Sequence, residues 1–415
     1  MKFLIAILWL SLSFAVAGPV SYYGKLEASG NKIIGSKTGD TPVQVRGVSF
    51  GWSNTSWESG RFYQAANAAT AVEHMVKDWK AEVVRAAYGA TSSAFTSTDA
   101  ATNRAGVERI VDGAIANDVY VIIDWHSHKA HNEIQQSKDF FDYMAQKYGS
   151  YDNVIFEIYN EPVCRDGTTN CAAADRINWA EIKSYAEQII PVIRAYSSNL
   201  ILVGTPQWSQ RVQDVAGNKL DGNVGYVLHF YAHTHPLNSF RNNINAALNG
   251  NVPLFVTEYG TVHADGGQNS NYDTHNVQNS DDWHSFMDQN KISSAAWQIN
   301  DKYEGSCFFG IQGAAKKFDM ESWADKTKMT PSGQYIFDKL NAYYQNAPWK
   351  DGPSPIKPLA VNLQDMGDVS VEIFSLQGKK LGTGRSVSDL NLKSGTYILL
   401  VRQGSQTKVL KIVKK

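Results

Sequence analysis

Eight apolar segments recur along the chain, and most are followed by a segment with the spacing of an amphipathic helix. The apolar segments are continuous, which is typical of parallel strands covered on both faces. The predicted strands are 45–50, 82–87, 119–125, 154–160, 200–205, 224–231, 254–260 and 294–301. Helical spacing occurs at 65–80, 104–117, 139–148, 176–195, 240–249, 281–289 and 332–344. Because no glycine-rich phosphate turn follows the first strand, the pattern predicts a closed (β/α)8 barrel rather than an open sheet.

The pattern changes at the N-terminus. Residues 1–17 combine Lys2, an apolar stretch and an Ala-Val-Ala cleavage site, which predicts a secretory signal peptide. An N-terminal membrane anchor is the alternative. No other stretch reaches spanning length, so we expect the mature protein to lack a transmembrane segment. Residues 22–45 alternate and turn twice, which predicts a hairpin that closes the bottom of the barrel.

The pattern changes again after the last predicted helix, so we expect the barrel domain to span residues 18–345. Residues 346–358 are rich in proline, which predicts a linker. Residues 359–415 contain short strands and turns, which predict a small all-β C-terminal domain. From residue 346 onward there are 11 Lys and Arg but only 5 Asp and Glu, whereas the whole chain has a net charge of −1. This charge asymmetry supports two modules.

Polar or aromatic residues stand at the C-terminal ends of six predicted strands, and in a (β/α)8 barrel those ends form one face. They are Arg85, His126, Asn160 with Glu161, His229 with Tyr231, Glu258, and Trp297. Any one of them alone would be read as an ordinary surface or core residue. Together they predict an active site, and two glutamates facing each other across it have the chemistry that glycoside hydrolysis requires.

The two glutamates have distinct predicted roles. Glu258 attacks the anomeric carbon, while Glu161 protonates the leaving oxygen and then activates water. We expect the charge of Glu258 and partial burial to raise the pKa of Glu161, so that it is protonated near neutral pH. Arg85 and the Tyr231 hydroxyl keep Glu258 ionised and oriented.

The other residues at the C-terminal ends of the predicted strands are expected to contact the sugar or to orient the groups that do. Asn160 hydrogen-bonds the sugar 2-hydroxyl, an interaction that strengthens in the transition state. His126 and His229 orient the carboxylates and sugar hydroxyls, and Trp297 forms a flat floor for the reacting ring. The aromatic content of 12% suits a protein that stacks on sugars, and the near-neutral charge argues against nucleic acid as a partner.

These motifs resemble glycoside hydrolase family 5, in its bacterial endoglucanase branch. The matching segments are, in order, VVRAA, VIIDWH, IYNEP, LHFY, FVTEYG and the late Trp297, with GWSNTSW, TPQWSQ and NDKYEG as further matches. The resemblance covers about residues 40–345. It implies a bacterial enzyme, secreted or at the cell surface, that cleaves internal bonds of β-1,4-glucan with retention and needs no cofactor. We expect it to act as a monomer.

The resemblance also implies substrate contacts beyond the catalytic pair. Two tryptophans are expected to stack on sugars on the minus and plus sides, a charged pair to contact a hydroxyl on the non-reducing side, and two further rings to line the cleft. The stacking tryptophans are Trp52 and Trp208, and the charged pair is Lys302 and Glu304. The two further rings are those of Tyr88 and His128. The chain departs from the family at Tyr259 and Arg46, which leaves the minus-side contacts less defined.

Several alternatives remain open from the sequence. Mannan, xylan and mixed-linkage glucan are neighbouring substrates of the same fold, because small differences between sugars give limited discrimination. A zinc hydrolase could draw ligands from two runs of histidines, although no HExxH motif is present; these are His126, His128 and His131, and His229, His233 and His235. A sugar-binding protein without catalysis is the third alternative.

The three cysteines suggest one disulfide. Cys164 and Cys171 bracket a short loop just after Glu161, and a secreted protein favours their pairing. Two free thiols are the alternative. Cys307 is then left over, most simply as a buried thiol.

The C-terminal domain resembles the sorting domains of bacteria that export proteins to their surface, which implies contact with an export machinery. The resemblance rests on the segments FSLQGK and SGTYILLV and on a basic end. The alternative is a small stabilising β-module. From residue 359 onward the aromatic residues are Phe374 and Tyr397, with no Trp, so a cellulose-binding module is disfavoured.

Overall fold

The computed structural model describes residues 18–54, 58–90, 100–311 and 318–350, and four strands beyond them. Contacts between residues divide the chain into two compact units, one spanning Ala17–Gly352 and one containing Pro353–Lys415. The predicted signal peptide, residues 1–17, lies outside the described residues. Among the helices that are described, none combines the length and the apolar character needed to cross a bilayer.

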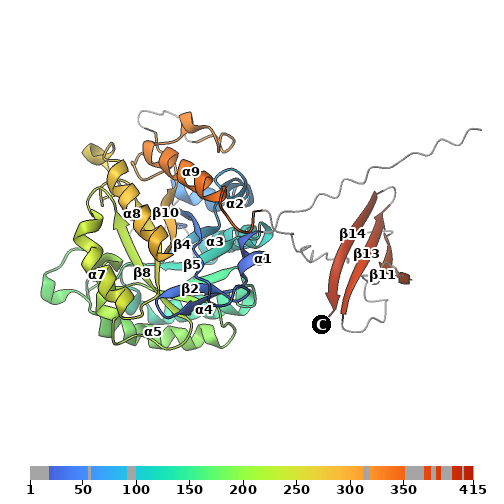
Figure 1. Cartoon of the computed structure of the whole chain (residues 1–415), viewed down its shortest axis with the longest axis horizontal. Coiled ribbons are helices and arrows are strands. Elements are labelled where there is room, and N and C mark those ends of the chain that lie inside the picture. Colours follow the sequence, from blue (N-terminus) through green and yellow to red (C-terminus); the bar gives the residue numbers. More distant parts are fainter. Residues whose placement is uncertain are drawn as a thin grey trace, which may run out of the picture. The chain divides into compact units, whose positions relative to one another are not determined.

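Eight parallel strands close into a barrel in the first unit, which confirms the predicted (β/α)8 fold (Figure 1). The strands pair in chain order, with the last beside the first. They are β3 (Arg46–Phe50), β4 (Val83–Gly89), β5 (Tyr120–His126), β6 (Val154–Glu157), β7 (Ile201–Val203), β8 (Val224–Tyr231), β9 (Leu254–Gly260) and β10 (Ser293–Ile299).

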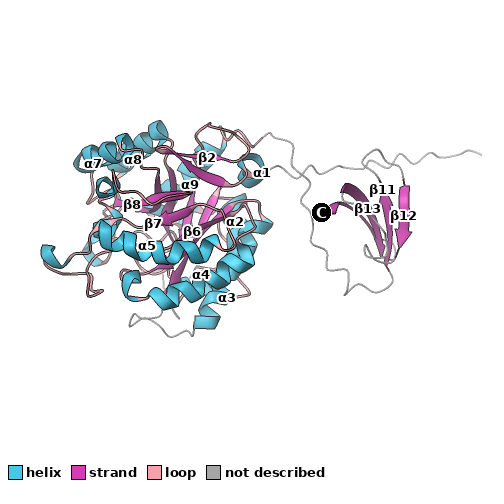
Figure 2. Ribbon diagram, turned by 90° about the horizontal axis from the view of Figure 1, so that it is seen from below, coloured by secondary structure: helices cyan, strands magenta, loops and turns pink. Residues whose placement is uncertain are grey.

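Helices surround the strands, as the cyan ribbons outside the magenta ones show (Figure 2). They are α1 (Pro19–Tyr23), α2 (Ala68–Lys77), α3 (Ala100–Ala116), α4 (Ile134–Tyr148), α5 (Trp179–Arg194), α6 (Pro206–Ser209), α7 (Leu237–Asn249), α8 (Val277–Asn290) and α9 (Pro331–Tyr344). Their boundaries follow local chemistry: α5 begins with a capping box between Asn178 and Glu181. In α9, Thr330 caps the helix and Pro331 occupies its first turn.

Apolar side chains fill the bottom of the barrel, under the predicted N-terminal hairpin. The hairpin consists of β1 (Leu26–Ser29) and β2 (Lys32–Gly35), and its Ile33 packs in one cluster with inward residues of the barrel strands. Trp349 joins the same cluster, and its Nε1 donates to Glu82 Oε1 at 2.6 Å. The packed unit therefore continues beyond the expected end at Gln345.

The second unit contains a four-stranded antiparallel sheet. Its strands are β11 (Val369–Phe374), β12 (Lys380–Gly384), β13 (Gly395–Gln403) and β14 (Gln406–Lys414). They are arranged in the order β12-β11-β13-β14. Adjacent β13 and β14 pair over their full length, as expected of a hairpin with a short turn. The sheet agrees with the small β-domain that the sequence pattern predicts.

Candidate active site

The inward side chains of the barrel change from apolar to polar along the strands. On β5, Tyr120 and Ile122 belong to the apolar cluster at the bottom of the barrel. Two and four residues further on, Asp124 and His126 contact each other and are also buried. Because alternate residues of a strand share a face, all four point inward. The apolar layer of the barrel is thus overlaid by a buried polar network.

Arg85, on β4, is fully buried at the centre of this network. Its Nε and Nη2 donate to the two oxygens of Glu157 at 2.8 and 3.0 Å, and its Nη1 donates to Glu258 Oε2 at 3.1 Å. Nη2 also contacts Asn160 Oδ1 at 2.7 Å and Asp124 Oδ2 at 2.9 Å. Burial opposes the charge of Arg85, but the three carboxylates outweigh it and raise its pKa.

An irregularity in β9 brings two consecutive side chains into the barrel. Val227 pairs with Phe255, but His229, two residues later, pairs with Glu258, so β9 carries one extra residue. As a result Thr257 and Glu258 both contact groups inside the barrel. In a regular strand one of the two would point outward.

Glu258 is oriented by a donor on each oxygen. The Tyr231 hydroxyl, from β8, donates to Oε1 at 2.8 Å, and Arg85 Nη1 donates to Oε2. The Glu258 side chain lines the cavity at the C-terminal ends of the strands. A carboxylate held in this way has its position set by its neighbours before substrate arrives.

Glu161 lies opposite, just beyond the end of β6, and is held by two histidines. His229 Nδ1 lies 2.9 Å from Glu161 Oε1, and His128 Nε2 lies 3.3 Å from Oε2. One oxygen of Glu161, one oxygen of Glu258 and a ring nitrogen of His229 all lie within 4.8 Å of one another. The two carboxyl groups therefore face each other at short range.

The two carboxyl groups are coupled electrostatically. Burial, followed by the charge of Glu161, raises the pKa of Glu258 to about 8. Burial also acts to raise the pKa of Glu161, but the hydrogen bonds from His128 and His229 outweigh it and hold that pKa below its usual value. The sequence predicted a raised pKa for Glu161, but the raised pKa is that of Glu258. Since the groups interact strongly, the proton belongs to the pair, which retains it at neutral pH.

Hydrogen-bond directions show where Glu161 can carry that proton. Thr257 Oγ1 donates to Glu157 Oε1 at 2.9 Å, because both Glu157 oxygens already accept from Arg85. A hydroxyl has one proton to donate, so Thr257 Oγ1 accepts from His229 Nε2 at 2.8 Å. If Nδ1 of His229 carries no proton, it can accept one from a protonated Glu161; if it carries a proton, it donates to an ionised Glu161.

His126 and two tryptophans form one wall of the site. The His126 ring stacks on Trp297 at 5.2 Å between ring centres and meets the edge of Trp52 at 4.4 Å. Burial and the charge of Arg85 lower the pKa of His126 well below its usual value, so the ring is neutral. His126 Nδ1 donates to Asp124 Oδ2 at 2.7 Å, which leaves Nε2 as an acceptor on a side chain that lines the cavity.

A cavity of about 360 Å³ gathers most of the predicted site residues. The predicted residues in its walls are Trp52, His126, His128, Glu161, Trp208, Tyr231, Glu258, Trp297, Lys302 and Glu304. Arg85, Asn160 and His229 are buried and contact Glu161, Glu258 or each other. Lys302 and Glu304 form a salt bridge with each other.

The structure corrects the prediction for Tyr88. This residue is buried against Trp125 and Phe140, with ring centres 5.3 and 4.3 Å apart, in the apolar layer between barrel and helices. The reason is strand alternation: Arg85 points into the barrel, so Tyr88, three residues later, points out.

The two departures from the family pattern also lie away from the cavity. Tyr259 is buried and stacks on Phe230. Arg46 pairs with Asp288 and lies over the ring of Tyr343, and it stands at the beginning of β3, far from the strand ends that carry the site. Neither residue lines the cavity.

Sequence reasoning missed three residues of the network: Asp124, Glu157 and Thr257. The signal was present for two of them, because Asp124 and Glu157 are charged residues inside otherwise apolar strands. Charged residues are rarely fully buried without a partner, and Arg85 is the matching cation. Cavity residues from the loops after β9 and β10, such as Asp265 and Asn300, carried no comparable signal.

The histidines of the zinc alternative do not assemble into a shared site. His131 contacts the Tyr159 hydroxyl and the Arg165 carbonyl, and His235 accepts from the Tyr231 backbone. Within the described ranges, the group with suitable ligand spacing is Glu161, His229 and Glu258. A guanidinium 3.1 Å from Glu258 disfavours a second cation there.

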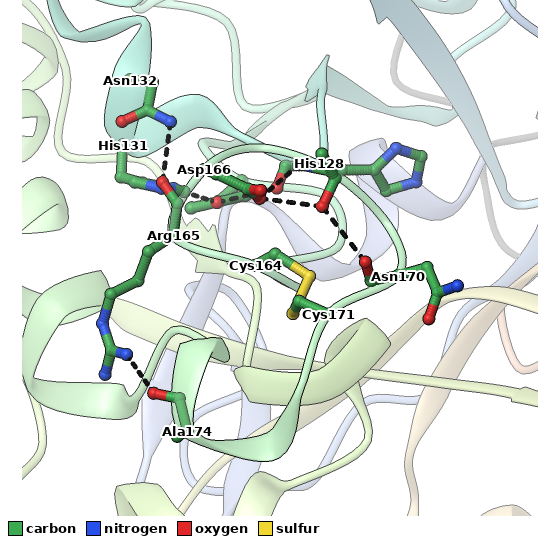
Figure 3. Close-up of a disulfide and its surroundings, with 11 residues drawn as sticks. His128, His131, Asn132, Cys164, Arg165, Asp166, Asn170, Cys171 and Ala174 are labelled. Atoms are coloured by element: carbon green, nitrogen blue, oxygen red, sulfur yellow. Dashed lines mark hydrogen bonds between the residues drawn. A yellow bond between two sulfur atoms is a disulfide. The ribbon is translucent and has the colours of Figure 1, made fainter.

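A disulfide closes the loop that follows Glu161. Cys164 and Cys171, the expected pair, are joined, with their Cα atoms 6.1 Å apart (Figure 3). Cys307 is a buried free thiol. The loop 164–171 lies next to the segment that carries His128 and His131, because His131 and Asn132 both contact the Arg165 carbonyl.

The chain is similar in sequence to known proteins that are named as cellulases and endoglucanases. Residues 36–303 match the family described as Cellulase (glycosyl hydrolase family 5). Endoglucanase Z of Dickeya dadantii is 41% identical over 330 residues, covering 79% of this chain and 68% of the relative. An endoglucanase of Clostridium saccharobutylicum is 35% identical, covering 81% of this chain and 70% of the relative.

Solved structures agree with the sequence matches. A protein from Cytophaga hutchinsonii is 37% identical with a TM-score of 0.67, covering 78% of this chain and 96% of that one. The catalytic domain of Thermobifida fusca endoglucanase Cel5A is 28% identical with a TM-score of 0.65, covering 78% of this chain and all of that one. The extent of these matches, over a barrel with two facing glutamates, shows that the chain belongs to glycoside hydrolase family 5 and is an endoglucanase of that family.

Proposed function

We propose that the protein hydrolyses internal β-1,4 bonds of glucan by double displacement, with Glu258 as nucleophile and Glu161 as acid and base. The observation that carries the proposal is the short approach of the two carboxyl groups, with oxygens within 4.8 Å. Retaining glycosidases place their carboxyl groups about 5–5.5 Å apart, whereas inverting ones leave about 6.5–9.5 Å for a water molecule.

In the first step Glu258 attacks the anomeric carbon while Glu161 gives its proton to the leaving oxygen. Tyr231 and Arg85 orient the attacking carboxylate, and Arg85 stabilises its ionised form. The contact with His229 Nδ1 allows Glu161 to hold a proton when that nitrogen acts as an acceptor. Proton donation then breaks one hydrogen bond to His229 and forms the hydroxyl of the leaving sugar.

In the second step Glu161 acts as a base. It has lost its proton, so it accepts one from water, which attacks the anomeric carbon and releases Glu258. His229 and His128 keep their contacts with the Glu161 oxygens and so hold the carboxylate in place for this step.

Sugar recognition would use groups that the protein leaves available. Asn160 Oδ1 contacts Arg85, and among the described residues its buried Nδ2 has no hydrogen-bond partner. That donor suits the sugar 2-hydroxyl, whose hydrogen bond strengthens in the transition state. His126 Nε2 offers an acceptor for a neighbouring hydroxyl, and Trp297 offers a flat apolar face.

Among polysaccharides, β-1,4-glucan is best supported. The Thermobifida fusca enzyme, a structural neighbour at 28% identity, has been solved in complex with cellotetraose. Mannan, xylan and mixed-linkage glucan remain the alternatives, because one hydroxymethyl group or one axial hydroxyl changes binding by only about 1–3 kcal/mol.

The test is the anomer and chain length of products released from soluble β-1,4-glucan. Wild type should give β-anomers and short oligosaccharides, and Glu258→Gln should be inactive while unfolding at a similar temperature. An α-anomer would contradict the double displacement. Activity confined to mannan or xylan would change the substrate, and no hydrolysis of any would favour the sugar-binding alternative. Activity lost on chelation would favour the zinc alternative.

We also propose that residues 1–17 direct secretion and that the C-terminal domain serves in sorting or surface attachment. Support for the second role is its separate, basic unit with an antiparallel sheet and no Trp. Comparison of the full chain with one ending at Gly352, which keeps the packed Trp349, tests the role. Equal export of both chains would favour the small stabilising module.

A further inference from the structure

His128, one of the two histidines that contact Glu161, lies on a loop and not on a strand. The loop, residues 127–133, joins the end of β5 to the start of α4. His128 Nε2 lies 3.3 Å from Glu161 Oε2, and the Glu161 backbone N donates to the Ser127 carbonyl, also at 3.3 Å. Because a loop has no ladder of hydrogen bonds to fix it, the position of His128 depends on the other contacts that the loop makes.

Tyr159, two residues before Glu161, supplies one of these contacts. Its side chain is fully buried, and its hydroxyl lies 3.1 Å from the His128 carbonyl and 2.6 Å from His131 Nδ1. Burial raises the pKa of Tyr159 well above its usual value, although backbone N–H groups of the loop act against it. The hydroxyl therefore keeps its proton and lies among the groups of the loop that carries His128.

His131 connects the Tyr159 hydroxyl to the disulfide loop. Its Nε2 lies 2.9 Å from the Arg165 carbonyl, which only accepts, so Nε2 carries a proton. Asn132 Nδ2 donates to the same carbonyl at 3.0 Å (Figure 3). A neutral His131 accepts from Tyr159 at Nδ1, whereas a charged His131 donates to Tyr159, whose hydroxyl then donates to the His128 carbonyl. In both forms Tyr159 and His131 stay hydrogen-bonded.

The Arg165 carbonyl is itself held in place from the other side. Arg165 N donates to the Asp175 carbonyl at 3.0 Å, and its Nε donates to Glu181 Oε1, in the first turn of α5, at 2.6 Å. The preceding residue, Cys164, is joined to Cys171. The contacts that begin at His128 therefore end on α5 and on the disulfide, two features that move little relative to the barrel.

The contact with His128 matters for the protonation of Glu161. Three ionisable groups face the Glu161 carboxyl group: His128 from the loop, His229 from β8 and Glu258 from β9. Burial acts to raise the pKa of Glu161, but the hydrogen bonds from the two histidines hold it below its usual value. A displacement of His128 would therefore raise the pKa of Glu161 and remove a contact that orients Oε2.

We propose that Tyr159 and His131 are positioning residues that hold His128 against Glu161. The inference rests on the acid and base role proposed for Glu161 above. Neither residue lines the catalytic cavity, so both act through His128 and not on the sugar. The disulfide loop supplies the fixed end of this cluster, through the Arg165 carbonyl.

The experiment measures the pH profile of kcat/KM on soluble β-1,4-glucan for Tyr159→Phe in the full chain. Phenylalanine keeps the buried ring and removes the hydroxyl. The value at the optimum should fall by about 2- to 10-fold, as expected for one lost hydrogen bond. Because the carboxyl pair then binds protons more tightly, at least one limb of the profile should move to higher pH by about 0.4–1 pH unit, and neither should move down.

Tyr185→Phe is the matched control. Tyr185, on α5, is similarly buried and its ring lies 5.4 Å from that of Tyr159, but its hydroxyl donates to the Ile158 carbonyl at 2.8 Å. The change removes a buried hydroxyl near the same strand without touching the loop 127–133. It should lower the melting temperature about as much as Tyr159→Phe does and leave both limbs of the profile in place.

His131→Ala provides a second test, and since His131 is only half-buried, this variant remains measurable even if Tyr159→Phe does not fold. It should move the profile in the same direction, and the double variant should lose less than the sum of the two single losses, as expected for residues that share a contact.

Two results would overturn the inference: a fall in activity with both limbs unmoved in Tyr159→Phe and His131→Ala, as in the control, or fully additive losses in the double variant. Inactivity of wild type on glucan, mannan and xylan would instead overturn the proposed function, and it would be seen before any variant is compared.

Discussion

Thr257→Val tests whether the chain from Glu157 through Thr257 to His229 controls the proton on Glu161. Valine preserves the shape of the fully buried threonine but removes its hydroxyl. The change breaks the bonds to Glu157 and to His229 Nε2, at 2.9 and 2.8 Å. His229, itself buried, is left with an unpaired N–H at Nε2 in the form that accepts from Glu161.

The expected magnitude follows from that unpaired group. A buried donor without a partner costs about 1–3 kcal/mol, and each 1.4 kcal/mol is a factor of ten. This cost destabilises the state in which Glu161 carries the proton. The value of kcat/KM for an unactivated glucan should therefore fall by about 5- to 150-fold. Since a dinitrophenyl leaving group needs little protonation, kcat/KM for dinitrophenyl cellobioside should fall much less.

The assay is kcat/KM on both substrates, for Thr257→Val and for Thr257→Ser, which keeps the hydroxyl and is the matched control. The serine variant should resemble wild type in the ratio between the two substrates. Equal losses on both substrates in Thr257→Val would refute the reasoning, because a general distortion of the site would slow the attack by Glu258 as well.

Three further predictions concern the buried charges. Activity on glucan should fall as pH rises through about 8, since the raised pKa means that the catalytic pair keeps its last proton below that pH and loses it above; a pH profile of kcat/KM with no alkaline limb in that region would contradict this. Arg85→Met should lower the free energy of unfolding by about 3–5 kcal/mol, because it leaves buried carboxylates uncompensated; urea unfolding measures it, and a loss within error of zero would speak against the network. Trp349→Phe should cost about 1–3 kcal/mol by leaving Glu82 Oε1 without its donor, with kcat unchanged; thermal unfolding together with activity checks both parts, and an unchanged melting temperature would exclude the contact.

Much of the fold follows from the hydrophobic pattern, because each barrel strand is buried on both faces and so appears as an apolar run. The pattern located all eight strands, including the three-residue β7, whose neighbours Leu200 and Thr205 are also buried. It did not locate α6, where Gln207 and Trp208 adopt left-handed backbone conformations that no periodicity encodes. Nor did proline content locate the end of the packed unit, because Trp349 packs in the apolar cluster at the bottom of the barrel and donates to Glu82, and proline content does not encode such contacts.

The sequence predicted which residue types form the site. It was less informative about whether a given side chain points into the barrel or away from it. Tyr88 and Glu258 show the difference. Strict alternation from Arg85 turns Tyr88 outward, and a count along β4 alone would have revealed it. The same count fails on β9, where an extra residue lets Thr257 and Glu258 both point inward.

The extra residue in β9 also explains how the proposed acid, Glu161, and the proposed nucleophile, Glu258, are linked. Thr257 faces the His229 that contacts Glu161, and Glu258, its neighbour, faces Arg85. A shift of one residue in β9 would therefore disturb the surroundings of Glu258 and of Glu161 together. Because Arg85 also binds Glu157, which accepts from Thr257, one continuous chain of hydrogen bonds joins Glu258 to Glu161. Substitutions at Thr257 and Arg85 should consequently be non-additive in kcat/KM, as expected for groups that share partners.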